Sequence, residues 1–267
     1  KLAQHYTSVP NILKLIKPLF LDEFYEELEK ATTINQLYKL QNRIAKAKFF
    51  DPACGSGNFL IITYKELRVL EIEIIKKIIE LSDGNVLNAF ASQIKISQFY
   101  GIEIDDFAHE IATLSLWLAE HQMNIIFEER LFEFAQVVSI LPLKSIANIV
   151  QGNSTRLNWE YVCPISETDE VYVIGNPPFE GSRGQVENQK DDLKVVFRED
   201  YKNLDYVSAW FYKGVQYIEN KNAKCAFVST NSICQGLQVA LLWKRIFSFN
   251  VEINFAYRSF KWKNNAK

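Results

Sequence analysis

The sequence predicts an α/β fold, in which a doubly wound, mostly parallel sheet carries helices on both faces. Short apolar segments rich in β-branched and aromatic residues recur along the chain, and longer segments with helical spacing separate them. These strands are expected near residues 48, 97, 148, 171, 225 and 252. A glycine-rich turn also joins the first strand to a long helix, as in folds that bind a ligand at the ends of their strands.

The bulk composition is that of a globular protein without a strong charge bias. The chain has 267 residues, enough to bury one substantial core, and 48% of them are hydrophobic. A formal net charge of -2 argues against a global basic surface for nucleic acid. Four scattered cysteines and three histidines predict neither a metal site nor a disulfide framework. No apolar run approaches the roughly 18 residues that cross a bilayer, so we expect a cytoplasmic protein.

The first part of the chain is predicted to be helical. Residues 1–47 are expected to form a helical segment that packs on a catalytic domain formed by residues 48–267. Apolar residues at helical spacing continue to Lys30, with Pro18 as a candidate kink. A second helix is expected to open at Thr32 or Thr33 and to continue to about Lys46.

The glycine-rich turn lies in the stretch KFFDPACGSGNFL, residues 48–60. An apolar strand ends there at Asp51, and Asn58 starts a long helix-forming segment. Gly55 and Gly57 allow the backbone to approach a ligand closely, and the first helical turn offers unpaired N–H groups. Because Asp51 would repel a phosphate, the ligand should carry a positive charge or amines at this turn. An ordinary strand-to-helix turn is the alternative.

A second acidic residue follows in the next strand-helix unit. The segment QIKISQFYGIEID, residues 93–105, predicts a strand that ends at Glu103, and a helix is expected from Phe107 to about Met123. A carboxylate at this place can accept hydrogen bonds from both hydroxyls of a ribose. Glu103 is therefore a candidate binding residue, with a solvated strand-end acid as the alternative. Residues 124–145 show no clear period and are expected to form short helices.

Two further strands follow, and the second runs into a proline pair. A third strand is expected over residues 146–151, and a buried fourth strand over residues 170–175 leads into Asn176-Pro177-Pro178-Phe179. The prolines fix the backbone, so one carbonyl and the Asn176 amide oxygen can face a single point beside an aromatic ring. Two acceptors and a stacking face suit a planar exocyclic amine, whereas a stiff exit from a strand is the plainer interpretation.

Together these motifs resemble those of a known family. In this order and near this spacing, DPACGSGNFL, YGIEID and GNPPF resemble the motifs of gamma-class N6-adenine DNA methyltransferases, which use S-adenosylmethionine. The resemblance is closest to the MmeI-like, type IIL fused restriction-modification enzymes. It extends over nearly the whole chain through HYTSVPNI, FLIITYKELRVLE, LDYVSAWFYKGVQYI, AFVSTNSICQG and YRSFKWKNNAK. One departure is Leu237, where an acidic residue would be expected, and this puts a local polar contact in doubt.

The resemblance implies a binding site for S-adenosylmethionine. Asp51 would hold the methionine ammonium, and Glu103 the ribose. The other implied cofactor contacts come from the turn, the strand ends and the N-terminus: Ala53, Gly55 and Gly57 along the cofactor, Ile104 on the face of its adenine, Asn153 or its neighbours at the adenine amine, and Tyr6 and Thr7 at the methionine end.

The resemblance also implies methyl transfer to the N6 amine of an adenine that flips out of double-stranded DNA. The Asn176 side chain and the Pro177 carbonyl would accept hydrogen bonds from that amine, in the rigid loop that Pro178 completes. Phe179 would stack on the base. A second aromatic would come from the last segment, where Phe260 is preferred over Trp262; packing in the core is the alternative for each.

The segment after this loop, residues 181–198, is polar and expected to be flexible. It could be a lid that carries Arg183 and Lys190, together with Lys194 and Arg198, to phosphates; a solvated loop is the alternative.

In the resembling fold a seventh, antiparallel strand follows the sixth, and we expect the catalytic domain to be incomplete at its C-terminus. A recognition domain and a nuclease domain are expected elsewhere in a full-length chain. Two alternatives stay open: a protein glutamine-amide methyltransferase, which also uses an Asn-Pro-Pro-aromatic loop, and an inactive scaffold that binds S-adenosylmethionine. Phe179 in place of tyrosine disfavours the first, and the intact Asn176 loop disfavours the second.

Overall fold

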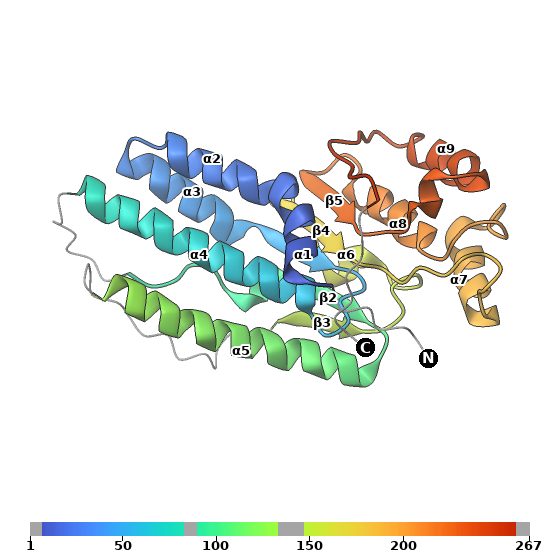
Figure 1. The fold of residues 1–267 in the computed structure, drawn as a ribbon, viewed down its shortest axis with the longest axis horizontal. Helices are drawn as coiled ribbons and strands as arrows, with labels where there is room; N and C mark the ends of the chain where they lie inside the picture. Colours follow the sequence, from blue (N-terminus) through green and yellow to red (C-terminus); the bar gives the residue numbers. More distant parts are fainter. Residues whose placement is uncertain (1–6, 83–89, 133–146, 260–267) are drawn as a thin grey trace.

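The computed structural model describes residues 7–82, 90–132 and 147–259. Its centre is a five-stranded parallel sheet in the order β3-β2-β1-β4-β5 (Figure 1). The strands are β1 (Lys48–Asp51), β2 (Phe99–Glu103), β3 (Asn148–Gln151), β4 (Val171–Gly175) and β5 (Ala223–Phe227). The predicted mostly parallel α/β sheet is confirmed.

The chain reverses its direction of winding at β1. From β1 the chain passes to β2 and β3 on one side, and then to β4 and β5 on the other. In the parallel register Asp51 lies beside Gly101 of β2, and Phe50 beside Val173 of β4. All strands therefore end at the same edge, with Asp51 at the switch point where such folds form a crevice.

Alternate side chains of the strands supply two separate cores. Phe49 and Tyr172 face a core formed with helices α1 (Val9–Ile16), α2 (Asp22–Lys30), α3 (Ile34–Lys46), α4 (Asn58–Leu81) and α5 (Asp106–Leu131). Phe50 and Val173 face a second core with α6 (Trp159–Val162), α7 (Glu187–Phe197), α8 (Ser208–Ile218) and α9 (Lys244–Ile246). The period of two along each strand thus yields the predicted doubly wound, three-layer architecture.

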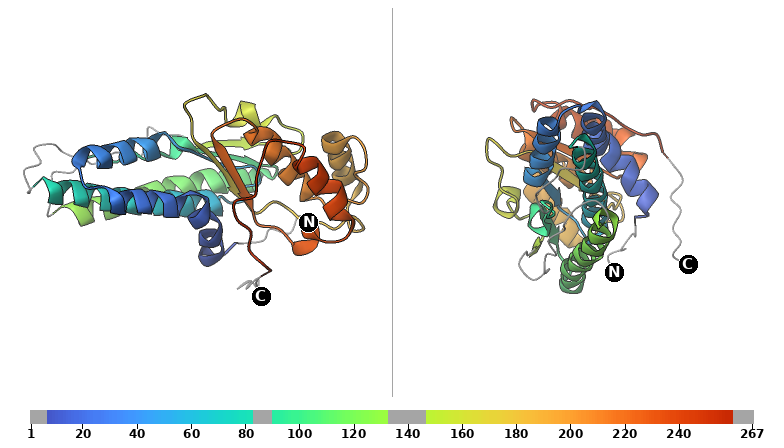
Figure 2. Two further views of the ribbon diagram at one scale, coloured as in Figure 1. Left: turned by 90° about the horizontal axis from the view of Figure 1, so that it is seen from above. Right: turned by 90° about the vertical axis from the view of Figure 1, so that its left-hand side faces the viewer.

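The long helices α2 to α5 continue past the sheet, on the side away from the carboxyl ends of the strands (Figures 1 and 2). Thirteen residues of α4 are buried, from Phe59 to Ile79, and most of them are apolar. No helix of the described ranges has an apolar stretch long enough to cross a membrane.

The predicted N-terminal helices are present. Thr33 caps α3 in a capping box with Gln36, as its position in the sequence indicated. Pro18 lies in one π-helical turn, Lys17–Leu21, that joins α1 to α2, and Figure 2 shows the two helices set at an angle. Because these helices share one core with the sheet, the division into segments 1–47 and 48–267 stays a prediction.

Three predictions of secondary structure are wrong. Residues 251–259 form no strand, and Ile253 and Tyr257 are more than half exposed, so this alternating segment lacks the buried face that a strand requires. Helix α5 continues to Leu131, through part of the stretch expected to form short helices. The segment 181–198 contains the helix α7, whose Leu193 and Phe197 are buried.

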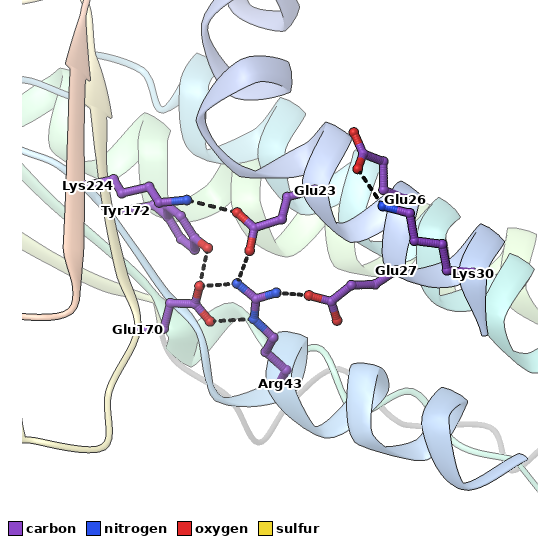
Figure 3. A network of polar contacts seen from close by, with 8 residues as sticks. All are labelled: Glu23, Glu26, Glu27, Lys30, Arg43, Glu170, Tyr172 and Lys224. Carbon is purple, nitrogen blue, oxygen red and sulfur yellow. Dashed lines mark hydrogen bonds and ion pairs between the residues drawn. The ribbon is translucent and has the colours of Figure 1, made fainter. Parts of the chain in front are cut away.

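A network around Arg43 ties the N-terminal helices to the sheet (Figure 3). Arg43 of α3 makes a bidentate pair with Glu170 next to β4, at 2.8 Å from Nε and 2.5 Å from a terminal nitrogen. It also donates to Glu23, at 2.6 Å, and to Glu27. Lys224 of β5 reaches Glu23 at 2.8 Å. Glu170 above all, and then Glu23, raise the pKa of Arg43 above its ordinary value, and burial opposes the rise.

Replacing Arg43 should destabilise the fold. Arg43→Met leaves Glu23, Glu27 and Glu170 crowded together without their shared cation, so the free energy of unfolding should fall by about 3 kcal/mol. Urea denaturation would measure this change. Lys30→Met, which removes only the exposed pair with Glu26, should cost less than about 0.5 kcal/mol. Equal losses in the two variants would contradict a clamping role for Arg43.

Candidate active site

A cavity of about 300 Å³ opens at the carboxyl ends of the strands. It is lined by residues at the ends of β1, β2, β3 and β4, by Thr7 just ahead of α1, and by the aromatic residues Tyr206 and Trp210 around the start of α8. The lining residues are Thr7, Asp51, Pro52, Ala53, Cys54, Gly55, Ser56, Asn58, Phe59, Ile102, Glu103, Ile104, Gly152, Asn153, Ser154, Asn176, Pro177, Pro178, Phe179, Tyr206 and Trp210. This set contains two carboxylates and neither lysine nor arginine, so the cavity favours a cation.

Asp51 is a buried carboxyl group at the base of this cavity. It is 1% exposed, and its Oδ1 accepts a hydrogen bond from the backbone N–H of Ala53 at 2.9 Å. Burial raises the pKa of Asp51 to about 8; Glu103 adds to the rise, and the bond from Ala53 opposes it. A cation in the cavity would restore the charged form. Gly175 at the end of β4 makes this position available, because a Cβ there would lie 2.5 Å from Asp51 Oδ1.

The raised pKa of Asp51 predicts a specific pH dependence of stability. In the folded state Asp51 holds a proton that the unfolded chain releases near pH 4. The contribution of this proton to the free energy of unfolding is therefore complete below pH 4 and is lost as the pH rises through about 8. Asp51→Asn does not titrate. The free energy of unfolding of the wild type should therefore fall relative to the variant by up to about 1.4 kcal/mol per pH unit. Urea titrations from pH 5 to 8 would measure this, and a constant difference would contradict it.

Glu103 joins the second strand to the glycine-rich turn. Its Oε2 accepts from the backbone N–H of Gly55 at 2.8 Å, and its Oε1 accepts from that of Asp105 at 2.8 Å. A carboxylate oxygen has further acceptor capacity, so Glu103 can hold the turn and still accept from a ligand hydroxyl. Gly55 has the left-handed backbone, with φ +54, that this turn needs.

Gly57, which the resemblance placed along the cofactor, lies outside the lining of the cavity. It precedes α4 with φ +87. A Cβ on Gly57 would lie 3.3 Å from the Cβ of Ala112 in α5. Its smallness therefore serves the close packing of α4 on α5, and its contact with a ligand stays a prediction.

Asn176 lines the cavity and carries a buried acceptor that is not used. Its Nδ2 donates to Oγ1 of Thr7 at 3.1 Å, and Thr7 is 2% exposed. This bond orients the amide, and Oδ1 is buried with no hydrogen-bond donor among the described residues. Burying an unsatisfied acceptor costs about 1–3 kcal/mol. Such a group at a cavity wall points to a donor that arrives with a ligand.

The proline pair is followed by an aromatic wall. Phe179 lines the cavity and packs on the second core. Tyr206 anchors the loop through its backbone N–H, which donates to the carbonyl of Glu180 at 2.8 Å. Trp210 donates from Nε1 to the carbonyl of Pro52 at 3.2 Å. The sequence interpretation gave Tyr206 and Trp210 no role at the site; their i, i+4 spacing around the start of α8 places them on one face.

Asn153, at the end of β3, lies on the cavity with its side chain already engaged. Its Oδ1 accepts from the backbone N–H and the hydroxyl of Thr155, at 3.0 and 2.6 Å. Its Nδ2 donates to Asp192. Both lone pairs of the amide oxygen are thereby used, so Asn153 can offer a ligand a donor rather than an acceptor. The neighbouring Ser154 has a buried hydroxyl without a partner in the described chain.

The remaining predicted residues lie elsewhere. Ile104 is half exposed at the rim of the cavity. Arg183 and Lys190 are exposed and do not line it, and Lys190 lies 3.7 Å from Glu187. Tyr6, Phe260 and Trp262 fall outside the described residues.

Leu237, which stands where the resemblance leads us to expect an acidic residue, is 63% exposed. The polar contacts at this place come from the next residue, Gln238. Its side chain accepts from the backbone N–H of Asp205 and donates to the carbonyl of Asn203.

Comparison with known proteins decides the family. The family model described as MmeI, DNA-methyltransferase domain, matches residues 26–267. The chain belongs to this family. The resemblance of the motifs to the MmeI-like enzymes is thereby confirmed.

The relatives are longer proteins. DNA methyltransferase A of Bacillus subtilis (strain 168) is 54% identical over 270 residues, which cover 100% of this chain and 30% of that protein. The structure of the Type IIL restriction-modification enzyme MmeI in complex with DNA is 45% identical, with a TM-score of 0.90, over 99% of this chain and 35% of that chain. A putative type II restriction enzyme and methyltransferase of Methanocaldococcus jannaschii is 38% identical over 102 residues, or 37% of this chain and 8% of that protein. The chain thus spans about a third of the first two relatives.

Proposed function

We propose that this chain is the catalytic domain of a site-specific DNA methyltransferase that transfers a methyl group from S-adenosylmethionine to the N6 amine of adenine. We further propose that it is the modification part of a restriction-modification protein. The named activities of the Bacillus subtilis relative and of MmeI support this proposal. The observation that carries it is the buried, unpartnered Oδ1 of Asn176 in a cavity that favours cations.

The residues of the cavity fit this cofactor. S-adenosylmethionine carries a sulfonium and an ammonium, and the lining offers Asp51 and Glu103 with no opposing cation. Asp51 would pair with the ammonium, a change that also relieves its raised pKa. Glu103 would accept from the ribose hydroxyls, beside Ile104, and Ala53 and Gly55 would pack along the chain. When bound, the cofactor supplies a methyl group on a good leaving group.

The chain's own contribution is to position and polarise the amine. The N6 nitrogen of adenine is a weak nucleophile because its lone pair is delocalised into the ring. Hydrogen bonds to Asn176 Oδ1 and to the Pro177 carbonyl would favour a pyramidal nitrogen with its lone pair free. Thr7 keeps the Asn176 amide in the required orientation, and Phe179 offers a stacking face. The base must leave the duplex to reach this cavity.

Double-stranded DNA is the proposed partner, with sequence recognition made mostly outside this chain. The formal net charge of -2 offers few phosphate contacts. Arg183 and Lys190, exposed after the Asn176 loop, are candidates for such contacts. Because the relatives are about three times as long, we also propose that a recognition domain, and a nuclease domain in some full-length proteins, accompany this domain.

The proposal is tested by identifying the methylated product. The longest natural polypeptide that contains this sequence would be expressed in a host without adenine methylation. Mass spectrometry of nucleosides from the host DNA should then show N6-methyladenine. Methylated glutamine in protein would support the alternative amide methyltransferase, and binding of S-adenosylmethionine without any methylated product would support an inactive scaffold.

Asn176→Ala should separate chemistry from binding. The substitution removes the acceptor for the amine, so the turnover number should fall by about 10²- to 10³-fold or more. Calorimetry should find the affinity for S-adenosylmethionine within about threefold of the wild type, since Asn176 is assigned to the base and not to the cofactor. A parallel loss of cofactor affinity would contradict this assignment.

Thr7 should act through Asn176. Thr7→Val removes the hydroxyl that accepts from Asn176 Nδ2, which frees the amide to rotate and should lower the turnover number by about tenfold. Thr7→Ser keeps the hydroxyl and is the matched control, with an expected loss below about threefold. If both variants lose activity equally, the methyl group of Thr7 matters more than its hydroxyl and the orienting role is wrong.

A further inference from the structure

Asp192 of α7 is a buried carboxylate just outside the cavity. Three donors from separate parts of the chain reach it. Tyr206 donates its hydroxyl at 2.7 Å, Arg156 its Nε at 2.7 Å, and Asn153 its Nδ2 at 3.1 Å to each carboxylate oxygen. Asp192 is 3% exposed, and the sequence interpretation assigned it no role.

Two of the three donors belong to the cavity. Asn153 lies at the end of β3, where the adenosine end of the proposed cofactor would be held, and Tyr206 lies on the wall shared with Phe179. Through its bonds to Asn153 and Tyr206, the carboxylate of Asp192 connects the lining after β3 with the aromatic wall. Arg156 supplies a compensating charge, but its side chain is 53% exposed and does not line the cavity.

The contacts of Asn153 define what its amide can still do. The two N–H bonds of an amide diverge, so a single N–H must be shared between the two oxygens of Asp192. The amide oxygen is occupied by Thr155. One N–H of Asn153 is thus left to donate to a ligand, and a ring nitrogen of a purine is a suitable acceptor. The backbone N–H of Thr155 fixes the oxygen end of this amide, and Asp192 fixes its nitrogen end.

We propose that Asp192 is a positioning residue for cofactor binding, which holds Asn153 in the orientation that receives the adenosine end of S-adenosylmethionine. This inference rests on the proposed function. It assigns Asp192 to affinity and not to the methyl-transfer step, because Asp192 does not line the cavity and receives its hydrogen bonds from Asn153, Arg156 and Tyr206. Burial and the bond to Asp192 also raise the pKa of Tyr206, so its hydroxyl stays a donor.

The test is Asp192→Asn in the longest natural polypeptide that contains this sequence. The variant keeps the shape of the side chain but replaces one acceptor oxygen with a donor. Its amide cannot accept hydrogen bonds from Asn153, Tyr206 and Arg156 together. The Kd and the KM for S-adenosylmethionine should rise about tenfold, because the variant loses one buried hydrogen bond to a charged group. The kcat should stay within about threefold of the wild type. Arg156→Gln leaves the bonds from Asn153 and Tyr206 intact and should change the Kd by less than about twofold.

A double-mutant cycle with Asn153→Ala shows whether Asp192 acts through Asn153. The double variant should bind S-adenosylmethionine no more than about twofold more weakly than Asn153→Ala alone. If Asp192→Asn does not fold, Asp192→Glu keeps the charge, displaces the oxygens by one methylene group, and should also raise the Kd.

A lower melting temperature with unchanged Kd and KM would overturn the inference, as would additive effects in the cycle. In either case the wild type would still bind the cofactor and methylate DNA. If the wild type neither binds S-adenosylmethionine nor yields N6-methyladenine, the proposed function itself fails, and the inference fails with it.

Discussion

The buried carboxyl group of Asp51 is the constraint around which the cavity is built. It lies at the switch point of the sheet, where β1 has β2 on one side and β4 on the other. Gly175 leaves the space for it, and the cavity lining provides no lysine or arginine to neutralise it. The protein therefore tolerates a buried acid with a pKa near 8. Burying an acid with no cation beside it costs free energy. Such groups are typical of functional sites, where a ligand supplies the missing partner.

The other parts of the site depend on this arrangement. Glu103 fixes the glycine-rich turn that follows Asp51, and Thr7, just ahead of α1, orients Asn176 from a distance of 169 residues in the chain. The N-terminal helices thus contribute a residue to the cavity as well as apolar surface to the core. The Arg43 network holds α2 and α3 against β4 and β5.

Local patterns in the sequence were enough to predict the strands near β1 to β5, the turn at Gly55 and the position of Asn176. Each depends on a few consecutive residues whose spacing has one good structural solution. The predictions that failed depend on tertiary contacts. The stretch near residue 252 alternates like a strand, yet no buried face forms there, and α7 is a helix whose buried side is set by the second core. The engagement of Asn153 by Asp192, 39 residues away, has no local signal at all.

The most direct test of this account is a crystal structure of the protein with an unreactive analogue of S-adenosylmethionine, in which an amine replaces the methylated sulfonium. We expect the α-ammonium of the analogue within hydrogen-bond distance of Asp51. The ribose hydroxyls should lie at Glu103, and the amine that replaces the sulfonium should face Asn176. An analogue bound outside this cavity, or bound inside it with its ammonium away from Asp51, would contradict the account.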